Sequence, residues 1–150
     1  MYRILLSYLF LSFSSFALAN SYVVMSSSDS TIKESIDIQD LRDIYLGNRL
    51  FWRNGERIFA AHINKESKQM KRFMKSVLSM TPRKYNKYWR RRLFSGKGHP
   101  PVEIDNDRKT IDYIRKTEGA IGIVGRRPKR ASKYLYFFKA SDDGHTLESI

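Results

Sequence analysis

The sequence predicts an α/β protein with a mixed sheet, because short β-rich segments alternate along the chain with segments of helical periodicity. Runs of apolar and β-branched residues at 22–25 and 120–124 are typical of buried strands. The intervening segments repeat apolar residues every three or four positions, and capping residues or glycines mark their ends. Since the sequence has no internal repeat and no linker, we expect residues 20–150 to form one domain, with an ordered core over about residues 22–138.

The first 19 residues have the pattern of a secretory signal peptide. Arg3 gives a positive start, residues 4–16 are apolar except for serines, and Ala17-Leu18-Ala19 is a small-x-small cleavage site. The apolar run is shorter than the roughly 20 residues that span a bilayer; an uncleaved amphipathic anchor is the alternative. We therefore expect the mature chain, residues 20–150, to be secreted across the inner membrane into the periplasm, without a transmembrane segment.

The composition limits the kinds of chemistry and the kinds of partner that can be expected of this chain. The chain carries a formal net charge of +13 at pH 7 and has no cysteine, which excludes a lipid anchor at the cleavage site, thiol chemistry and cysteine–zinc sites. A basic surface favours anionic partners, such as phosphate, an acidic polymer or an acidic protein of the envelope. Export makes nucleic acid the least favoured of these. The alternative is that the lysines and arginines form solvated helix faces that keep the protein soluble.

The first half of the expected domain contains two strands and a helix. Tyr22–Met25 predicts the opening strand, and a serine-rich loop follows it. Apolar residues at helical spacing predict a helix over residues 36–45, with Gly47 as its stop. The Asn-Gly pair within residues 51–55 predicts a turn, and residues 57–63 alternate as a strand does.

Two helices are expected next. Asn64 is the expected cap of the first, whose apolar face is Met70, Phe73, Met74, Val77 and Leu78. Thr81-Pro82 has the pattern of a cap followed by proline at the first helical position. The helix that it opens carries Tyr85, Tyr88, Trp89 and Leu93 on one face and basic residues on the others.

The last third of the chain predicts a loop at residues 95–101 and then a helix that Asn106 or Asp107 caps. A buried strand at residues 120–124 and a basic turn at 125–133 follow.

An aromatic strand over residues 134–138 completes the expected sheet, and the tail from Ala140 onward is expected to be frayed.

Few residues of the sequence form a pattern that is typical of a catalytic site. The three histidines are far apart and none has a metal-ligand spacing: His62, His99 and His145. The acidic cluster Glu103, Asp105 and Asp107 could supply an acid and a base, but a helix N-terminus explains it more simply. We therefore expect a binding or interaction protein rather than an enzyme, with no cofactor and no metal.

Anion binding is better supported, because helix N-termini present unpaired N–H groups and the positive end of a dipole. The helix near Asn64 begins directly after a strand, and we expect its start to meet the loop after the first strand at one sheet edge. The expected oxyanion-binding residues are Ser26, Ser27, Ser28, Asn64 and Ser67. Glu66 would place a negative charge there, and a capped surface helix is the alternative.

The basic turn at residues 125–133 is the expected partner surface. A turn can form without so many positive charges, so its geometry does not explain the four basic residues Arg126, Arg127, Lys129 and Arg130. Like charges this close repel each other unless an anionic partner neutralises them.

Several segments, in order, resemble the periplasmic phosphate-binding proteins of phosphate ABC transporters. They are Asp-Leu-Arg-Asp-Ile-Tyr-Leu-Gly-Asn at 40–48, Trp52-Arg53-Asn54-Gly55, Phe73, Tyr88-Trp89 with Phe-Ser-Gly-Lys-Gly-His-Pro-Pro at 94–101, and Glu-Gly-Ala-Ile-Gly-Ile-Val at 118–124. The similarity runs from about Tyr22 to Phe138. It implies a three-layer mixed sheet like one lobe of a type 2 periplasmic binding protein, and binding of phosphate or a related oxyanion.

The chain departs from that family in two ways. The family's Ser-Gly-Thr at the phosphate is matched here only by the serine of Glu66-Ser67-Lys68, and the chain resembles one lobe of two. One lobe leaves a ligand half in water, where its contacts are weakened. The resemblance therefore implies an exported solute-binding-like protein that binds phosphate weakly or with a partner. The alternative is a non-transport envelope module whose basic surface binds an anionic polymer or a protein.

Overall fold

The computed structural model describes residues 22–26, 36–126, 135–140 and 147–149. In these ranges the helices are α1 (Ile38–Tyr45), α2 (Lys68–Ser76), α3 (Pro82–Phe94) and α4 (Asp107–Lys116). The strands are β1 (Tyr22–Ser26), β2 (Phe59–Ile63), β3 (Val102–Ile104), β4 (Ala120–Val124), β5 (Leu135–Ala140) and β6 (Leu147–Ser149). The signal-peptide segment lies outside the described residues.

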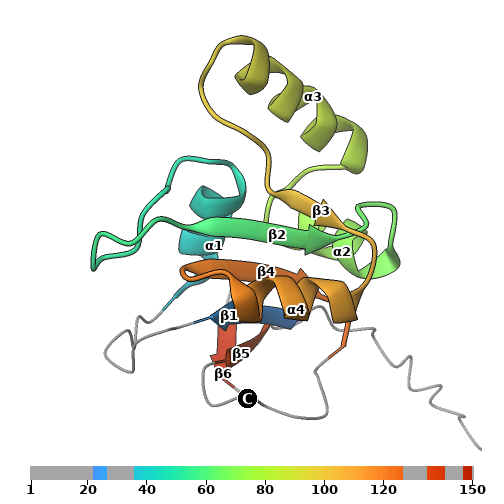
Figure 1. Cartoon of the computed structure of the whole chain (residues 1–150). Helices are drawn as coiled ribbons and strands as arrows, with labels where there is room; N and C mark the ends of the chain where they lie inside the picture. The colour runs from blue at the N-terminus through green and yellow to red at the C-terminus, as the bar shows by residue number, and fades with distance from the viewer. Residues whose placement is uncertain (1–21, 27–35, 127–134, 141–146, 150) are drawn as a thin grey trace, which may run out of the picture.

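The described strands form one six-stranded sheet in the order β3-β2-β4-β1-β5-β6 (Figure 1). β2 pairs in parallel with β3 and with β4. β1 runs antiparallel to both of its neighbours, β4 and β5, and β6 runs antiparallel to β5. The predicted mixed sheet is therefore confirmed.

Alternate residues of β4 pack against opposite layers. Ile121 and Ile123 join the larger core cluster with α1, α2 and α3, whereas Ala120 and Val124 pack with residues of α4. Figure 1 shows α4 in front of the sheet and α1 and α2 behind it. The predicted three-layer α/β architecture is thus present, and every residue of β4 is buried.

Most helix boundaries follow their predicted caps. Thr81 caps α3 and Asn106 caps α4, each accepting a backbone N–H with its side chain. The predicted cap of α2 is wrong, because Ser67 caps that helix and accepts the Met70 N–H at 3.2 Å. Asn64 instead accepts the Glu66 N–H at 2.8 Å, which shapes the loop before the helix.

The predicted apolar face of α2 is entirely buried. On α3, Tyr85 and Trp89 are buried, but Leu93 is 48% exposed because the end of the helix extends beyond the sheet (Figure 1). The expectation of a frayed tail is also corrected, since residues 147–149 pair with β5 as β6.

α3 is held close to the loop that follows α1. Gly47 has φ +69°, and a Cβ on it would lie 2.7 Å from Cη2 of Trp89, so a larger residue would push α3 away. Tyr88 donates its hydroxyl to the Leu46 carbonyl at 2.6 Å, and Arg92 Nη2 donates to the Gly47 carbonyl at 2.9 Å. Arg92 is therefore a structural residue rather than part of the solvated basic surface.

Tyr45 should couple stability to alkaline pH. Its hydroxyl donates to the Ala61 carbonyl at 2.6 Å, and burial raises its pKa well above the ordinary value. Because an unfolded tyrosine ionises near pH ~10, this contribution is present below that pH and is lost as pH rises above it. We expect Tyr45→Phe to lower the free energy of unfolding by about 0.5–1.5 kcal/mol at neutral pH. Above pH ~10 the variant should lose stability less steeply than the parent chain.

Chemical denaturation at a series of pH values measures both effects. Tyr113→Phe is the control, because that hydroxyl has no hydrogen bond in the described structure, and it should change stability by less than about 0.5 kcal/mol. Equal stability and equal alkaline slopes for Tyr45→Phe and the parent chain would contradict the expectation.

Candidate anion-binding groove

A groove of about 1010 Å³ lies at the carboxyl ends of β2, β3 and β4. We call it the carboxyl-end groove; the start of α2, one side of α4 from Asp107 to Arg115 and the turn after β4 line it. These three strands are parallel to one another, so the chain leaves all of them at the same edge of the sheet. In open α/β sheets such an edge is where ligands bind.

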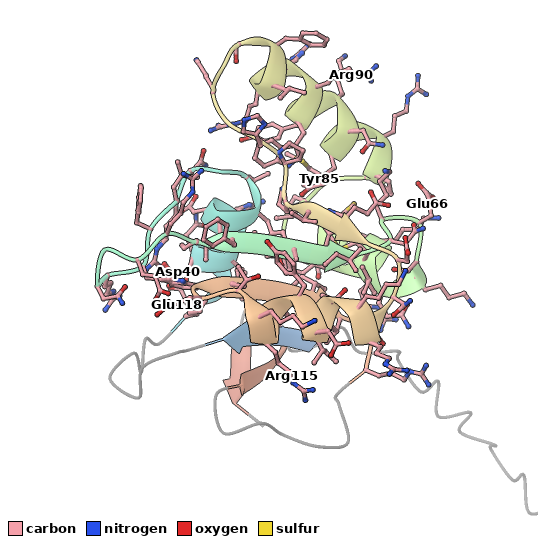
Figure 2. The ribbon with its side chains drawn as sticks, in the orientation of Figure 1. Asp40, Glu66, Tyr85, Arg90, Arg115 and Glu118 are labelled. Atoms are coloured by element: carbon pink, nitrogen blue, oxygen red, sulfur yellow. The ribbon has the colours of Figure 1, made fainter. Side chains whose placement is uncertain are left out.

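The N-terminus of α2 is the part of the groove whose chemistry best suits an anion. Ser67 satisfies one N–H of the first turn with its side-chain oxygen and keeps its own hydroxyl hydrogen for another acceptor. The helix dipole places partial positive charge at this end. The sequence led us to expect Glu66 beside a bound oxyanion. Glu66 pairs instead with Lys71 at 2.8 Å and is not among the residues that line the groove (Figure 2).

The N-terminus of α4 carries a carboxylate of the chain, because Asp107 is the first residue of that helix. Asp107 accepts the Gly125 N–H at 2.7 Å, and Arg126 Nε lies 3.9 Å from the same side chain. This contact joins the start of α4 to the end of β4. An anion in the groove would therefore meet the α2 terminus rather than the α4 terminus.

The charged side chains that line the groove balance each other. Three aspartates and three arginines line it: Asp105, Asp107, Asp112, Arg108, Arg115 and Arg126. Asp105 accepts a hydrogen bond from Lys109 at 2.6 Å, and this contact holds the pKa of Asp105 below its usual value. Arg115 lies 4.0 Å from Asp112, and both are exposed enough for water to screen them. The groove thus offers the N–H groups and the dipole of the α2 N-terminus, with no net charge from its side chains.

The predicted oxyanion site is only partly assembled. Asn64 and Ser67 both line the groove. Ser26 lies at the opposite end of the sheet, because Met25 pairs with Ile121 near the start of β4 whereas β2 leaves the sheet beyond Ile123. The expectation of a common edge is wrong, since β1 runs antiparallel to β4. Ser27 and Ser28 lie outside the described residues.

The predicted partner surface is described at one residue. The Arg126 side chain is 90% exposed at the rim of the groove; Arg127, Lys129 and Arg130 lie outside the described residues. The sequence analysis missed Arg108 and Arg115 as groove residues. Only the spacing of α4 could have shown that they share its groove-facing side with Ile111.

Neither a metal site nor a membrane-crossing helix is found in the described ranges. No group of three or more His, Asp or Glu side chains there is arranged to hold a metal ion. No helix there is both long enough and apolar enough to cross a bilayer.

Comparison with known proteins supports the fold. No protein-family model matches the sequence, and no curated protein is significantly similar to it. The structure resembles the crystal structure of PstS from Borrelia burgdorferi, a phosphate-binding protein, with a TM-score of 0.51 and 14% sequence identity. The match covers 71% of this chain and 40% of PstS. The chain therefore has a fold similar to part of a solute-binding protein and spans about two fifths of its length.

Proposed function

We propose that this chain is an exported solute-binding-like protein that takes phosphate or a related oxyanion in the carboxyl-end groove. The observation that carries the proposal is the position of the α2 N-terminus, with Ser67 and Asn64, at the carboxyl ends of three parallel strands. The similarity of the fold to part of PstS points to the same ligand class. The signal-peptide pattern and the same similarity favour a periplasmic location.

Binding by the isolated chain should be weak. Small-ligand sites usually bury most of the ligand, whereas the wall of this groove comes from a chain that resembles only one lobe. Three aspartates in the groove would also repel an anion. Phosphate contacts that remain in water are screened by salt and solvent. A partner that covers the groove would remove that water, so the proposal includes binding that is weak alone or completed by a partner.

A negative charge introduced at the N-cap of α2 tests whether phosphate binds in the carboxyl-end groove. Ser67→Asp keeps a good N-cap and adds a favourable dipole interaction, so the helix should remain stable. The new carboxylate would stand where the oxyanion binds, and phosphate binding should fall by about tenfold or more. Calorimetry, together with amide resonances of the first turn of α2, measures binding during a phosphate titration at constant ionic strength.

Two controls separate the site from a general charge effect. Thr81→Asp makes the same charge change at the cap of α3, outside the groove, and should leave phosphate binding unchanged. Ser67→Asn keeps a neutral cap and should weaken binding less than Ser67→Asp does. If Ser67→Asp and Thr81→Asp bind phosphate equally well, the groove is not the site.

The outer surface of α3 favours a second function, an envelope interaction module. α3 contains six basic residues and no acidic residue. Its exposed side carries Arg83, Lys84, Lys87, Arg90 and Arg91. Phe94 is 84% exposed and lines a shallow hollow with Lys87, Arg90 and Arg91. An exposed aromatic ring among cations is suited to an anionic polymer or an acidic protein partner.

Retention on heparin, an anionic polymer, tests this second function. The triple substitution Arg83→Ala, Lys87→Ala and Arg91→Ala should elute at clearly lower salt than the parent chain, because fewer counterions are released on binding. Its thermal stability should change little, since these side chains are exposed. The matched control removes three exposed lysines elsewhere, Lys68, Lys75 and Lys116. Equal elution of the two triple variants would show that only total charge matters.

A further inference from the structure

A second hollow, of about 370 Å³, lies between α3 and the edge of the sheet formed by β2 and β3. We call it the aromatic pocket. Its walls are His62, Tyr85, Trp89, Leu93, Pro100 and Pro101, and the polar residues Lys65, Asn86, Arg90 and Glu103 also line it. Figure 2 shows Tyr85 at the junction between α3 and the sheet. The pocket is separate from the carboxyl-end groove, because His62 and Ile63 on β2 point to opposite faces of the sheet.

Two buried donors in this pocket have no acceptor. Tyr85 and Trp89 are 3% and 5% exposed, and their rings meet edge to face with centroids 6.4 Å apart. Neither the Tyr85 hydroxyl nor the Trp89 indole N–H has a hydrogen-bond partner within the described structure. A buried polar group without a partner destabilises the fold, because it has lost its hydrogen bonds to water and gained none in return. Two of them side by side in one hollow therefore indicate an absent acceptor.

Comparable groups elsewhere in the chain are satisfied. The Trp52 indole N–H donates to the Gly119 carbonyl at 2.9 Å, and the hydroxyls of Tyr45 and Tyr88 donate to backbone carbonyls at 2.6 Å. Two other buried polar atoms of the described residues, Glu56 Oε1 and Arg92 Nε, also lack a partner, but neither lines the pocket. Tyr85 and Trp89 are thus the described tyrosine and tryptophan that combine burial, contact with each other and an unpaired polar atom. Burial raises the pKa of Tyr85, and the closeness of the Trp89 N–H to the Tyr85 oxygen lowers it in part, although no hydrogen bond between the two is formed. The Tyr85 hydroxyl therefore keeps its hydrogen at physiological pH.

The charges around the pocket leave one cation uncompensated. Nδ1 of His62 lies 2.7 Å from the Ile63 carbonyl oxygen, which assigns the ring proton to Nδ1. Burial lowers the pKa of His62, so its ring is neutral at pH 7. Lys65 and Glu103 pair with each other at 2.7 Å. Arg90 has no ion pair in the described structure, so it gives the lining residues a net charge of +1.

We propose that the aromatic pocket binds a small carboxylate with an apolar body. The two carboxylate oxygens accept hydrogen bonds from the Tyr85 hydroxyl and the Trp89 indole N–H, and the charge faces Arg90. The apolar body lies against Leu93, Pro100 and Pro101. The volume suits a ligand of this size. Phosphate fits less well, because its additional charge and oxygens would meet apolar walls.

The two tryptophans of the chain make a direct test possible. A benzoate titration of the ¹⁵N-labelled protein should shift the Trp89 indole N–H resonance downfield in a saturable manner. The Trp52 indole resonance should stay in place, since its hydrogen bond to Gly119 is already formed. Benzyl alcohol, which has the ring but no carboxylate, should bind at least about tenfold more weakly, as expected for a lost charge-assisted pair.

Two tyrosine variants distinguish recognition from folding. Tyr85→Phe should weaken benzoate binding by about tenfold, and it should not lower the melting temperature, because the hydroxyl it removes has no partner. Tyr88→Phe should lower the melting temperature, because it breaks the bond to Leu46, and should leave benzoate binding unchanged. Inorganic phosphate should not shift the Trp89 resonance.

Several results would overturn the proposal. They are a fixed Trp89 resonance up to the solubility limit of benzoate, equal affinity for benzyl alcohol, and unchanged binding by Tyr85→Phe. A Trp89 shift with phosphate would also overturn it and would assign the pocket to a different anion. Because the groove is tested by phosphate and Ser67→Asp, failure at one site leaves the result at the other intact.

Discussion

The parallel pairing of β2 with both β3 and β4 is the constraint on which the rest of the structure depends. Parallel neighbours need long connections, so α2, α3 and α4 must return the chain across the sheet between them. All three strands then end at one edge, and the starts of α2 and α4 meet there. Close packing of α4 completes the arrangement: a Cβ on Gly122 would lie 2.5 Å from Cδ1 of Ile114. The glycine thus allows the helix to lie directly on the sheet.

The elements that could be predicted are those whose burial has a local period. The apolar spacing of α2 and the continuous apolar run of β4 predict which residues are buried. The apolar face of α2 and all of β4 are buried as predicted. The caps of α3 and α4 are local as well. β6 could not be predicted in this way, because three residues give no period and the strand depends on pairing with β5.

The candidate sites depend on facts that local patterns do not contain. Strand direction decides which loops meet, and it places Ser26 away from Ser67 although both follow predicted strands. The bond from Gly125 to Asp107 joins residues 18 positions apart and occupies the start of α4. Periodicity predicts that Tyr85 and Trp89 are buried, but it cannot show whether their polar atoms find partners.

The shortness of both edge strands has a consequence for how copies of this protein meet. β3 and β6 are each three residues long, and two prolines without N–H groups directly precede β3. Another strand at the β3 edge would find few backbone groups to pair with, and Glu103 would stand beside it. The same short edge therefore opposes growth of the sheet from one molecule into the next, a useful restraint in an apolar-cored protein without disulfides.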